Sequence, residues 1–248
     1  MTSTPLQTRR ENIAIVLCRP KYGGNIGSVA RVAMNMGIER IIVAEPAGVN
    51  MAEAKKLATH FASPLVDQIE YFPALKEALA GFQWIVGTTS KLGKGRRPVV
   101  HPRQAAEEIV SISQHNQVAL LFGAEDDGLT NEDLRYCHSF VTIPADRKFS
   151  SLNLSHAVMV ICYELFIARI ADETPFVPRL ASSVELEGMY ENLRDFLIEA
   201  DFLKHKDPDQ QMLYLRRFLS RTRLTSQDVQ VIRGICRQIQ WYTNNKSA

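Results

Sequence analysis

The sequence has few cysteines and lacks the patterns that would give them a structural task. Its four cysteines are scattered, with no Cys-x-x-Cys pair, which argues against a zinc ribbon or a disulfide framework. The six histidines form no metal or triad pattern either. We therefore expect reduced, mostly buried thiols and no bound metal.

Long hydrophobic runs are also missing. No segment reaches the roughly 18 uninterrupted apolar residues of a membrane-spanning helix, and the first ten residues, MTSTPLQTRR, contain no apolar core of a signal peptide. With 248 residues, 46% of them hydrophobic, the chain can still bury a substantial core. The sequence predicts a globular cytoplasmic protein with no membrane contact.

Charge is nearly balanced overall but not along the chain. The formal net charge is +2, yet residues 204–248 hold nine Lys or Arg against three acids. Such an imbalance points to a polyanionic partner, although an amphipathic helix with a solvated basic face gives the same count. Charge alone leaves both explanations open.

Short apolar runs alternate with amphipathic stretches over the first two thirds of the chain. The alternation predicts an α/β fold, in which helices cover both faces of a parallel sheet. The predicted strands are 13–18, 40–46, 83–89, 117–123 and 139–144. The predicted helices are 25–36, 50–62, 73–80, 103–111, 131–136 and about 153–170.

The last third of the chain has a different pattern. Residues 171–181 contain two prolines and no period, so we expect a linker after a first domain over 1–170. Apolar residues then recur at i, i+3 and i+4. This spacing predicts an all-helical basic extension over 182–248, with breaks near 207–208 and 222–226.

A glycine-rich turn, GGNIGSVAR (23–31), follows the first predicted strand. It suggests a dinucleotide site, but G-x-G-x-x-G would need a glycine where Tyr22 stands. Glu45, at the end of the second strand, could accept ribose hydroxyls in such a site, but a solvated strand end before Pro46 is the favoured explanation. A nucleotide-dependent oxidoreductase is therefore disfavoured.

Glycines and small polar residues also end three later strands, at 87–90, 122–130 and 143–155. Ligands of open α/β sheets bind outside the carboxyl ends of the strands. We therefore expect a cofactor at these three late loops. The first turn is then free to serve a substrate.

Motifs in these turns resemble those of the TrmH-type SPOUT RNA ribose methyltransferases. The first is N-x5-R, the second G-x-E-x-x-G-L and the third S-L-N-L-S, and the resemblance covers residues 11–170. The tail, with RRFLSRTR (216–223), resembles the helical extension of those members that methylate tRNA at nucleotide 32 of the anticodon loop.

The resemblance implies both a fold and an activity. It implies a SPOUT sheet with a C-terminal trefoil knot, S-adenosylmethionine as cofactor, and a homodimer with the active site at the subunit interface. The implied reaction is 2'-O-methylation of a tRNA ribose. The alternatives are the same chemistry on ribosomal RNA and a non-catalytic RNA-binding protein with the same fold.

The candidate site residues follow from the motifs and the neighbouring loops. The candidate catalytic residues are Asn25, Arg31, Glu125, Ser151 and Asn153. The candidate cofactor contacts are Thr88, Thr89, Gly123, Glu125, Ile143, Ser151 and Leu152. The candidate RNA contacts are Lys91, Lys94, Arg96 and Arg97 in one loop and Arg216, Arg217, Arg221 and Arg223 in the tail.

Methyl transfer from a sulfonium has a neutral leaving group and needs neither an acid nor a metal. The enzyme must hold the hydroxyl about 3 to 3.5 Å from the methyl carbon and make its oxygen more anionic. The resemblance implies that the matching arginine, Arg31, is the general base, but deprotonating a guanidinium at neutral pH would cost several kcal/mol before any catalysis. We therefore expect Arg31 to orient the substrate phosphate as a cation and to stabilise the developing alkoxide.

The remaining motif residues have competing roles. Glu125 is expected to anchor Asn25 and Arg31. Asn25, expected to hold the ribose or to brace Arg31, could at the same time cap the helix 25–36, and for Ser151 and Asn153 a capping role competes with a site role. Asp126 and Asp127 could be solvated acids near a helix start or magnesium ligands.

Overall fold

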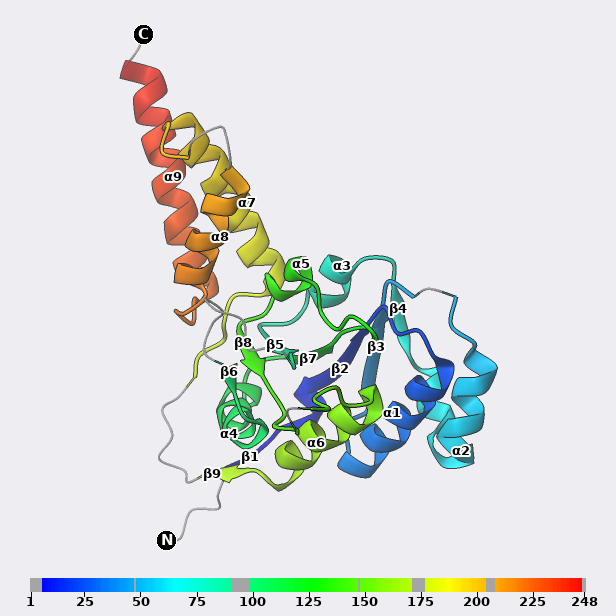
Figure 1. Ribbon diagram of the computed structural model, residues 1–248. Coiled ribbons are helices and arrows are strands. Elements are labelled where there is room, and N and C mark those ends of the chain that lie inside the picture. The colour runs from blue at the N-terminus through cyan, green and yellow to red at the C-terminus, as the bar shows by residue number, and fades with distance from the viewer. Residues whose placement is uncertain are drawn as a thin grey trace, which may run out of the picture. The chain divides into compact units, whose positions relative to one another are not determined.

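The computed structural model describes residues 6–46, 48–90, 99–146, 148–170, 177–203 and 208–246. The chain divides into two units, Met1–Val177 and Pro178–Ala248. The first unit contains the sheet and the second consists of helices (Figure 1). No helix in the described ranges is both long and apolar enough to cross a membrane.

Seven parallel strands form the main sheet of the first unit, in the order β4-β3-β2-β7-β5-β8-β6. They are β2 Ile13–Cys18, β3 Arg40–Ala44, β4 Glu70–Phe72, β5 Trp84–Thr88, β6 Val99–Val100, β7 Val118–Phe122 and β8 Ser139–Val141. All five predicted strands are present. A separate pair joins β1 Leu6–Gln7 to β9 Arg169–Ile170. The unpredicted strands have only two or three residues, too few to show a period.

Helices cover both faces of the sheet, as predicted. Figure 1 shows α3 and α5 on one face and α1, α4 and α6 on the other. The helices are α1 Gly23–Met36, α2 Met51–Asp67, α3 Leu75–Leu79, α4 Pro102–Ser113, α5 Asn131–Leu134 and α6 Leu154–Ile167, with a 3-10 turn, η1, at Arg10–Asn12. The helix predicted to reach 170 ends at Ile167, because the next residues pair with β1.

Both faces of β2 are buried because helices pack on each. Ala14, Val16 and Cys18 join a core with Leu75 and Leu79 of α3. The intervening β2 residues are equally buried and point to the opposite face. This explains why the strand is apolar at every position instead of alternating.

The glycines of the first turn serve helix packing. A Cβ at Gly23 would overlap the carbonyl oxygen of Asn50, and one at Gly27 would overlap that of Ala54. Asn50 is the N-cap of α2. The two glycines therefore allow α1 to approach α2 more closely than side chains would permit.

The strand order determines which loops can meet. β7 lies between β2 and β5, and β8 pairs with the other side of β5. The loops after these four strands therefore emerge side by side at the carboxyl edge of the sheet. The loops after β7 and β8 carry the second and third motifs, and the first motif begins in the first turn of α1, which follows β2. The trefoil knot remains a prediction.

The second unit contains the three predicted helices, α7 Ser183–Glu199, α8 Pro208–Leu219 and α9 Ser226–Lys246. Their core includes Met189, Tyr190, Met212 and Val229. Leu180, just before α7, forms a β-bridge with Thr225 just before α9. The residues around Leu180 therefore pack with the tail.

Candidate active site

A cavity of about 560 Å³ opens at the carboxyl ends of β5, β7 and β8. The late loops form its wall, as expected for a ligand site in an open α/β sheet. All of the predicted cofactor contacts line it: Thr88, Thr89, Gly123, Glu125, Ile143, Ser151 and Leu152. The structure thus gathers residues from three separate segments around one space.

The loop after β7 is tight because of its two glycines. The Gly128 amide donates to the Ala124 carbonyl at 2.8 Å, closing a turn. Gly128 has φ +69°, which side chains disfavour. A Cβ at Gly123 would overlap the Gly128 backbone. The spacing of glycines in G-x-E-x-x-G therefore has a direct steric cause.

Residues of all three motifs contact one another at the rim of this cavity. Asn25 Nδ2 donates to Glu125 Oε1 at 2.8 Å. Asn153 Nδ2 donates to Asn25 Oδ1 at 3.0 Å. Glu125 Oε2 accepts the Lys21 amide at 2.9 Å. Asn25 therefore joins the second motif to the third, and Glu125 anchors it as expected.

The helix-capping alternatives have different outcomes. Tyr22, not Asn25, is the N-cap residue of α1, so the capping role considered for Asn25 is wrong. Asn153 is the N-cap of α6 and its Oδ1 accepts the Ser155 amide at 2.9 Å. Asn153 therefore caps the helix and contacts Asn25 at once. Ser151 precedes the cap and lines the cavity.

Arg31 lies apart from the other motif residues. It is an exposed residue of α1, six positions after Asn25, which places it about 9 Å further along the helix and roughly 120° around it. It does not line the cavity of its own chain. Its guanidinium has no hydrogen bond or ion pair with any part of the chain that the structure describes. The expected contact with Glu125 is thus absent between these two described side chains.

Sequence reasoning missed Lys21, which contacts the second motif with its side chain as well as its amide. Its Nζ lies 2.6 Å from Asp126 Oδ2 and 4.0 Å from Asp127 Oδ2. The hydrogen bond with Asp126 raises the pKa of Lys21. The two acids precede α5 by several residues, and its N-cap is Thr130. Asp126 is therefore an ion-pair partner, a role that neither sequence interpretation anticipated.

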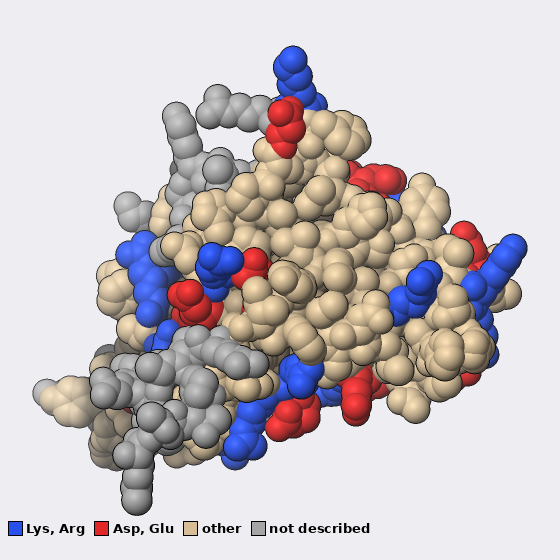
Figure 2. Space-filling model, turned by 90° about the horizontal axis from the view of Figure 1, so that it is seen from below, with Lys and Arg blue, Asp and Glu red and all other residues tan. Residues whose placement is uncertain are grey.

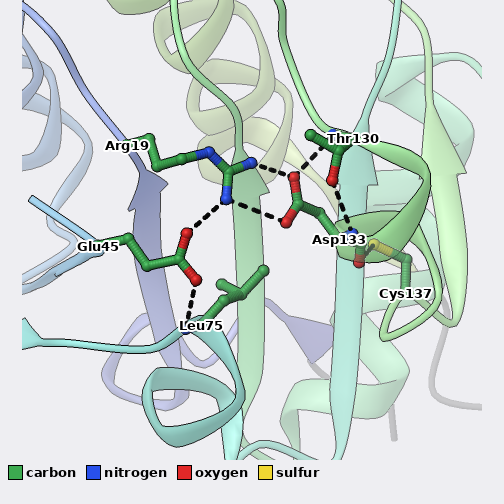
Figure 3. Close-up of polar contacts among 6 residues, drawn as sticks. All are labelled: Arg19, Glu45, Leu75, Thr130, Asp133 and Cys137. Carbon is green, nitrogen blue, oxygen red and sulfur yellow. Dashed lines mark hydrogen bonds and ion pairs between the residues drawn. The ribbon is translucent and has the colours of Figure 1, made fainter.

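Glu45 is neither a solvated strand end nor a residue of the cavity. Its Oε2 accepts Arg19 Nη1 at 2.6 Å, and its Oε1 accepts the Leu75 amide at 3.1 Å (Figure 3). β3, which ends beside it, is not a neighbour of β5, β7 or β8. The arrangement gives no support to a dinucleotide site at Glu45.

The candidate RNA contacts fall into two groups. Lys91, Lys94, Arg96 and Arg97 lie outside the described residues. In the tail, Arg221 and Arg223 are exposed and Arg217 is half-buried. Arg216 instead donates to Glu187 at 2.6 and 2.7 Å and stacks over the Tyr190 ring. Arg216 is therefore held inside the tail by an acid that the sequence did not single out.

Two family models match the chain. Residues 12–163 match the SpoU rRNA methylase family. Residues 184–248 match the C-terminal domain of the tRNA methyltransferase TrmJ. A TrmJ of Klebsiella pneumoniae, named as a tRNA (cytidine/uridine-2'-O-)-methyltransferase, is 35% identical over 95% of this chain and 99% of its own length.

Solved structures give the same picture. A crystal structure of TrmJ from Z. mobilis superimposes with a TM-score of 0.79 at 29% identity, covering 92% of this chain and 98% of that one. The SpoU methyltransferase AviRb of Streptomyces viridochromogenes, solved with AdoMet, has a TM-score of 0.51 at 24% identity, covering 65% of this chain and 59% of its own. The second similarity shows the fold alone.

Proposed function

Because the chain belongs to the SpoU rRNA methylase family, and to the TrmJ group within it, we propose that it methylates a ribose 2'-hydroxyl of tRNA with S-adenosylmethionine as donor. The proposed target is the cytidine or uridine at nucleotide 32 of the anticodon loop. The contacts of Asn25 with Glu125 and Asn153 carry the proposal. They assemble the three motifs beside the one cavity where the cofactor contacts were expected.

We place S-adenosylmethionine in the cavity at β5, β7 and β8. When bound, it supplies a sulfonium methyl group. The residues present fit such a ligand, because Ile143 and Leu152 offer apolar walls to a purine ring. Gly123 also lines the cavity, and its missing side chain lets the loop 123–130 fold back against it at Gly128.

Asn25 is the proposed ribose contact. A side-chain amide has two N–H donors and two acceptor lone pairs, and Asn25 uses one of each on Glu125 and Asn153. These bonds fix the orientation of the amide and leave one donor and one acceptor for a substrate hydroxyl. Glu125 and Asn153 are therefore positioning residues.

A homodimer accounts for the apolar surface of α6. This helix is apolar on nearly all sides, and it exposes Tyr163, Phe166 and Ile167. Seen from the side where α1, α4 and α6 lie, the middle of the face carries uncharged residues (Figure 2). Exposed apolar patches of this kind mark interaction sites. We propose that a second copy of the chain covers α6.

The proposed dimer also gives Arg31 a place in the reaction. Arg31 is an exposed residue of α1, which packs beside α6, and it does not line the cavity of its own chain. In a dimer built on α6, Arg31 of one protomer can reach the substrate bound by the other. There it would hold the phosphate and stabilise the alkoxide that forms on the 2'-oxygen.

The tail is the proposed RNA-binding module. Its exposed cations Arg221 and Arg223 lie just after α8, which also exposes Tyr214 and Phe218. Arginines bind phosphates, and aromatic rings stack on unpaired bases. Arg216 is left out of this proposal because Glu187 occupies its guanidinium.

Methyl transfer to purified RNA tests the proposed function. The protein is incubated with isotope-labelled S-adenosylmethionine and, in separate reactions, with unmodified tRNA and unmodified ribosomal RNA. We expect label in tRNA only. Label in ribosomal RNA alone would establish the alternative that the family description suggests, and RNA binding without transfer would indicate a non-catalytic protein.

A thermal shift measurement tests the cofactor independently. A ligand at one hundred times its dissociation constant stabilises the folded state by about 2.7 kcal/mol. We expect this stabilisation with S-adenosylhomocysteine and none with NADH. Stabilisation by NADH alone would contradict the proposed cofactor.

A further inference from the structure

Arg19 joins the segment before the first motif to the segment after the second motif, outside the cavity. It is the first residue after β2, and its amide donates to the Ala44 carbonyl at 2.9 Å. Its guanidinium lies between the carboxylates of Glu45 and Asp133 (Figure 3). Nη1 donates to Glu45 at 2.6 Å and to Asp133 Oδ1 at 3.3 Å, while Nη2 donates to Asp133 Oδ2.

Asp133 connects this junction to the cavity wall. It closes a capping box with Thr130: Asp133 Oδ2 accepts the Thr130 amide at 2.7 Å, and Thr130 Oγ1 accepts the Asp133 amide at 3.2 Å. Thr130, Leu129 and Asn131 all line the cavity. The residue that binds Arg19 therefore also fixes the end of the loop 123–130.

The other end of the same loop is held by the same segment. The Lys21 amide and the Asn25 side chain both donate to Glu125, at 2.9 and 2.8 Å. The segment 19–25 thus contacts the loop near its beginning, at Glu125, and at its end, through Asp133. Displacement of either contact would change the shape of the cavity and the position of Asn25 together.

The Asp133 carboxylate depends on Arg19. Its side chain is only 6% exposed, and a buried carboxylate is costly unless a cation and hydrogen bonds compensate it. The hydrogen bond with Asp133 is also the main cause that raises the pKa of Arg19, so the guanidinium stays charged. Without Arg19, the buried Asp133 carboxylate would lose its cation, and a movement toward solvent would disturb its bonds with Thr130.

The backbone at this junction is itself held in place by these contacts. Arg19 has φ +53° and Glu45 has φ +54°. A residue with a side chain adopts this left-handed conformation only where surrounding interactions hold it. Two adjacent strands therefore end in the same unfavourable turn, with their charged side chains meeting at 2.6 Å.

We propose that Arg19 is a positioning residue for methyl transfer: by binding Asp133 it fixes the loop 123–130, and so sets both the cofactor cavity and the alignment of Asn25 with it. This inference rests on the proposed function. It assigns different roles to the two ion pairs of Arg19. Asp133 holds the end of the loop 123–130, whereas Glu45 binds the start of α3.

The test measures S-adenosylhomocysteine affinity by calorimetry, and kcat and KM on tRNA, for folded variants below their melting temperatures. Arg19→Met removes the guanidinium group and keeps an unbranched aliphatic side chain. We expect a loss of cofactor affinity of tenfold or more together with a lower kcat. Arg19→Lys should restore little, since one ammonium cannot bridge both oxygens of Asp133. Asp133→Asn should weaken cofactor binding in the same way.

Two matched controls separate positioning from stability. Arg40→Met breaks the ion pair with Glu70, at 2.7 Å, between the first residues of two strands and thus at the amino edge of the same sheet. Glu45→Gln removes the negative charge that Arg19 contacts on its other side. Both should lower the melting temperature and leave cofactor affinity within about twofold of the wild type.

The outcomes separate failure of the inference from failure of the function. If the wild type binds no S-adenosylhomocysteine, the proposed function fails. If it binds, but Arg19→Met or, should that variant not fold, Asp133→Asn keeps wild-type affinity and kcat, Arg19 is only structural and the inference is wrong. Equal losses in Arg40→Met would also overturn it.

Discussion

The two units of the chain use charged and polar side chains in opposite ways. In the first unit they bind one another across distant loops: Asn25 to Glu125 and Asn153, and Arg19 to Asp133. In the tail most described basic side chains are at least partly exposed, including Arg194 in its ion pair with Asp209, and Arg216 is held inward by Glu187. We infer that the first unit depends on exact placement, while the tail depends on the sum of its exposed charge.

The largest expected effect concerns Arg31. Arg31→Ala should lower turnover by at least about 100-fold, because it removes the cation proposed to stabilise the alkoxide. S-adenosylhomocysteine affinity should hardly change, since Arg31 does not line the cavity. Arg31→Lys should recover little, as an ammonium lacks the planar fork. Single-turnover rates and calorimetry measure the two quantities, and a variant with wild-type turnover would remove Arg31 from the mechanism.

Deletion of the tail should separate the two units functionally. A chain ending at Val177 should fold and bind S-adenosylhomocysteine, because the sheet, its helices and the cavity lie before that point. Its tRNA affinity should fall tenfold or more. The boundary falls before Leu180 because that residue pairs with Thr225 of the tail. Loss of cofactor binding would show that the units are not independent.

Charge reversal tests the tail without deleting it. The double variant Arg221→Glu and Arg223→Glu should weaken tRNA binding, and the slope of log affinity against log salt should fall by about 0.7 to 0.9 for each phosphate that is no longer bound. The combined change Arg216→Met and Glu187→Leu is the matched control, because it removes a guanidinium that is bound to Glu187 without leaving a buried unpaired charge, and it should leave the slope unchanged. An unchanged slope in the double variant would show that these arginines are only solvated surface residues that bind no phosphate.

The ion pair of Arg216 with Glu187 should contribute to the stability of the tail and not to RNA binding. Glu187→Ala leaves the Arg216 guanidinium, 15% exposed, without its carboxylate, and should destabilise the tail by about 2 kcal/mol or more. The combined change Arg216→Met and Glu187→Leu should recover most of this loss, because apolar residues replace both charges. Urea unfolding of the full chain measures both. Equal stability of Glu187→Ala and wild type would contradict the assignment.

The smallest effect is a pH dependence of the tail. The backbone amide and hydroxyl of Thr225 donate to Asp228 and lower its pKa from the ordinary 3.8. A carboxyl group whose pKa is lower in the folded than in the unfolded protein stabilises the folded state at any pH above its unfolded-state pKa. This stabilisation is lost as the pH falls through the folded-state pKa. The melting temperature of the tail should therefore decrease as the pH is lowered below about 4. Asp228→Asn should flatten the profile.

The sequence predicted most helices and strands, but only some of the contacts between them. Apolar periodicity is local, so the five main strands and the tail helices could be recognised directly. The family resemblance predicted that the three motifs meet at one site. The hydrogen bonds of Asn25 with Glu125 and Asn153 show how they are joined. The glycines of the first turn suggested a ligand, but Gly23 and Gly27 pack α1 against α2.

What could not be predicted depends on partners distant in the chain. Nothing around Arg19 in the sequence shows its left-handed backbone or its pairing with Asp133. Arg216 looked like Arg221 because both are basic residues of one segment, and only the fold brings Glu187 to it. Lys21 was overlooked for the same reason, since its partners lie in the second motif.

Mapping the methylated nucleotide tests the central claim most directly. Unmodified total tRNA is incubated with the wild-type protein and S-adenosylmethionine, and 2'-O-methyl positions are located by their resistance to alkaline cleavage, with Asn25→Ala as the inactive control. Protection of the bond after nucleotide 32, for both cytidine and uridine and absent with the control, is the predicted result. No protected bond in tRNA, with a cofactor-bound and dimeric protein, would contradict the account.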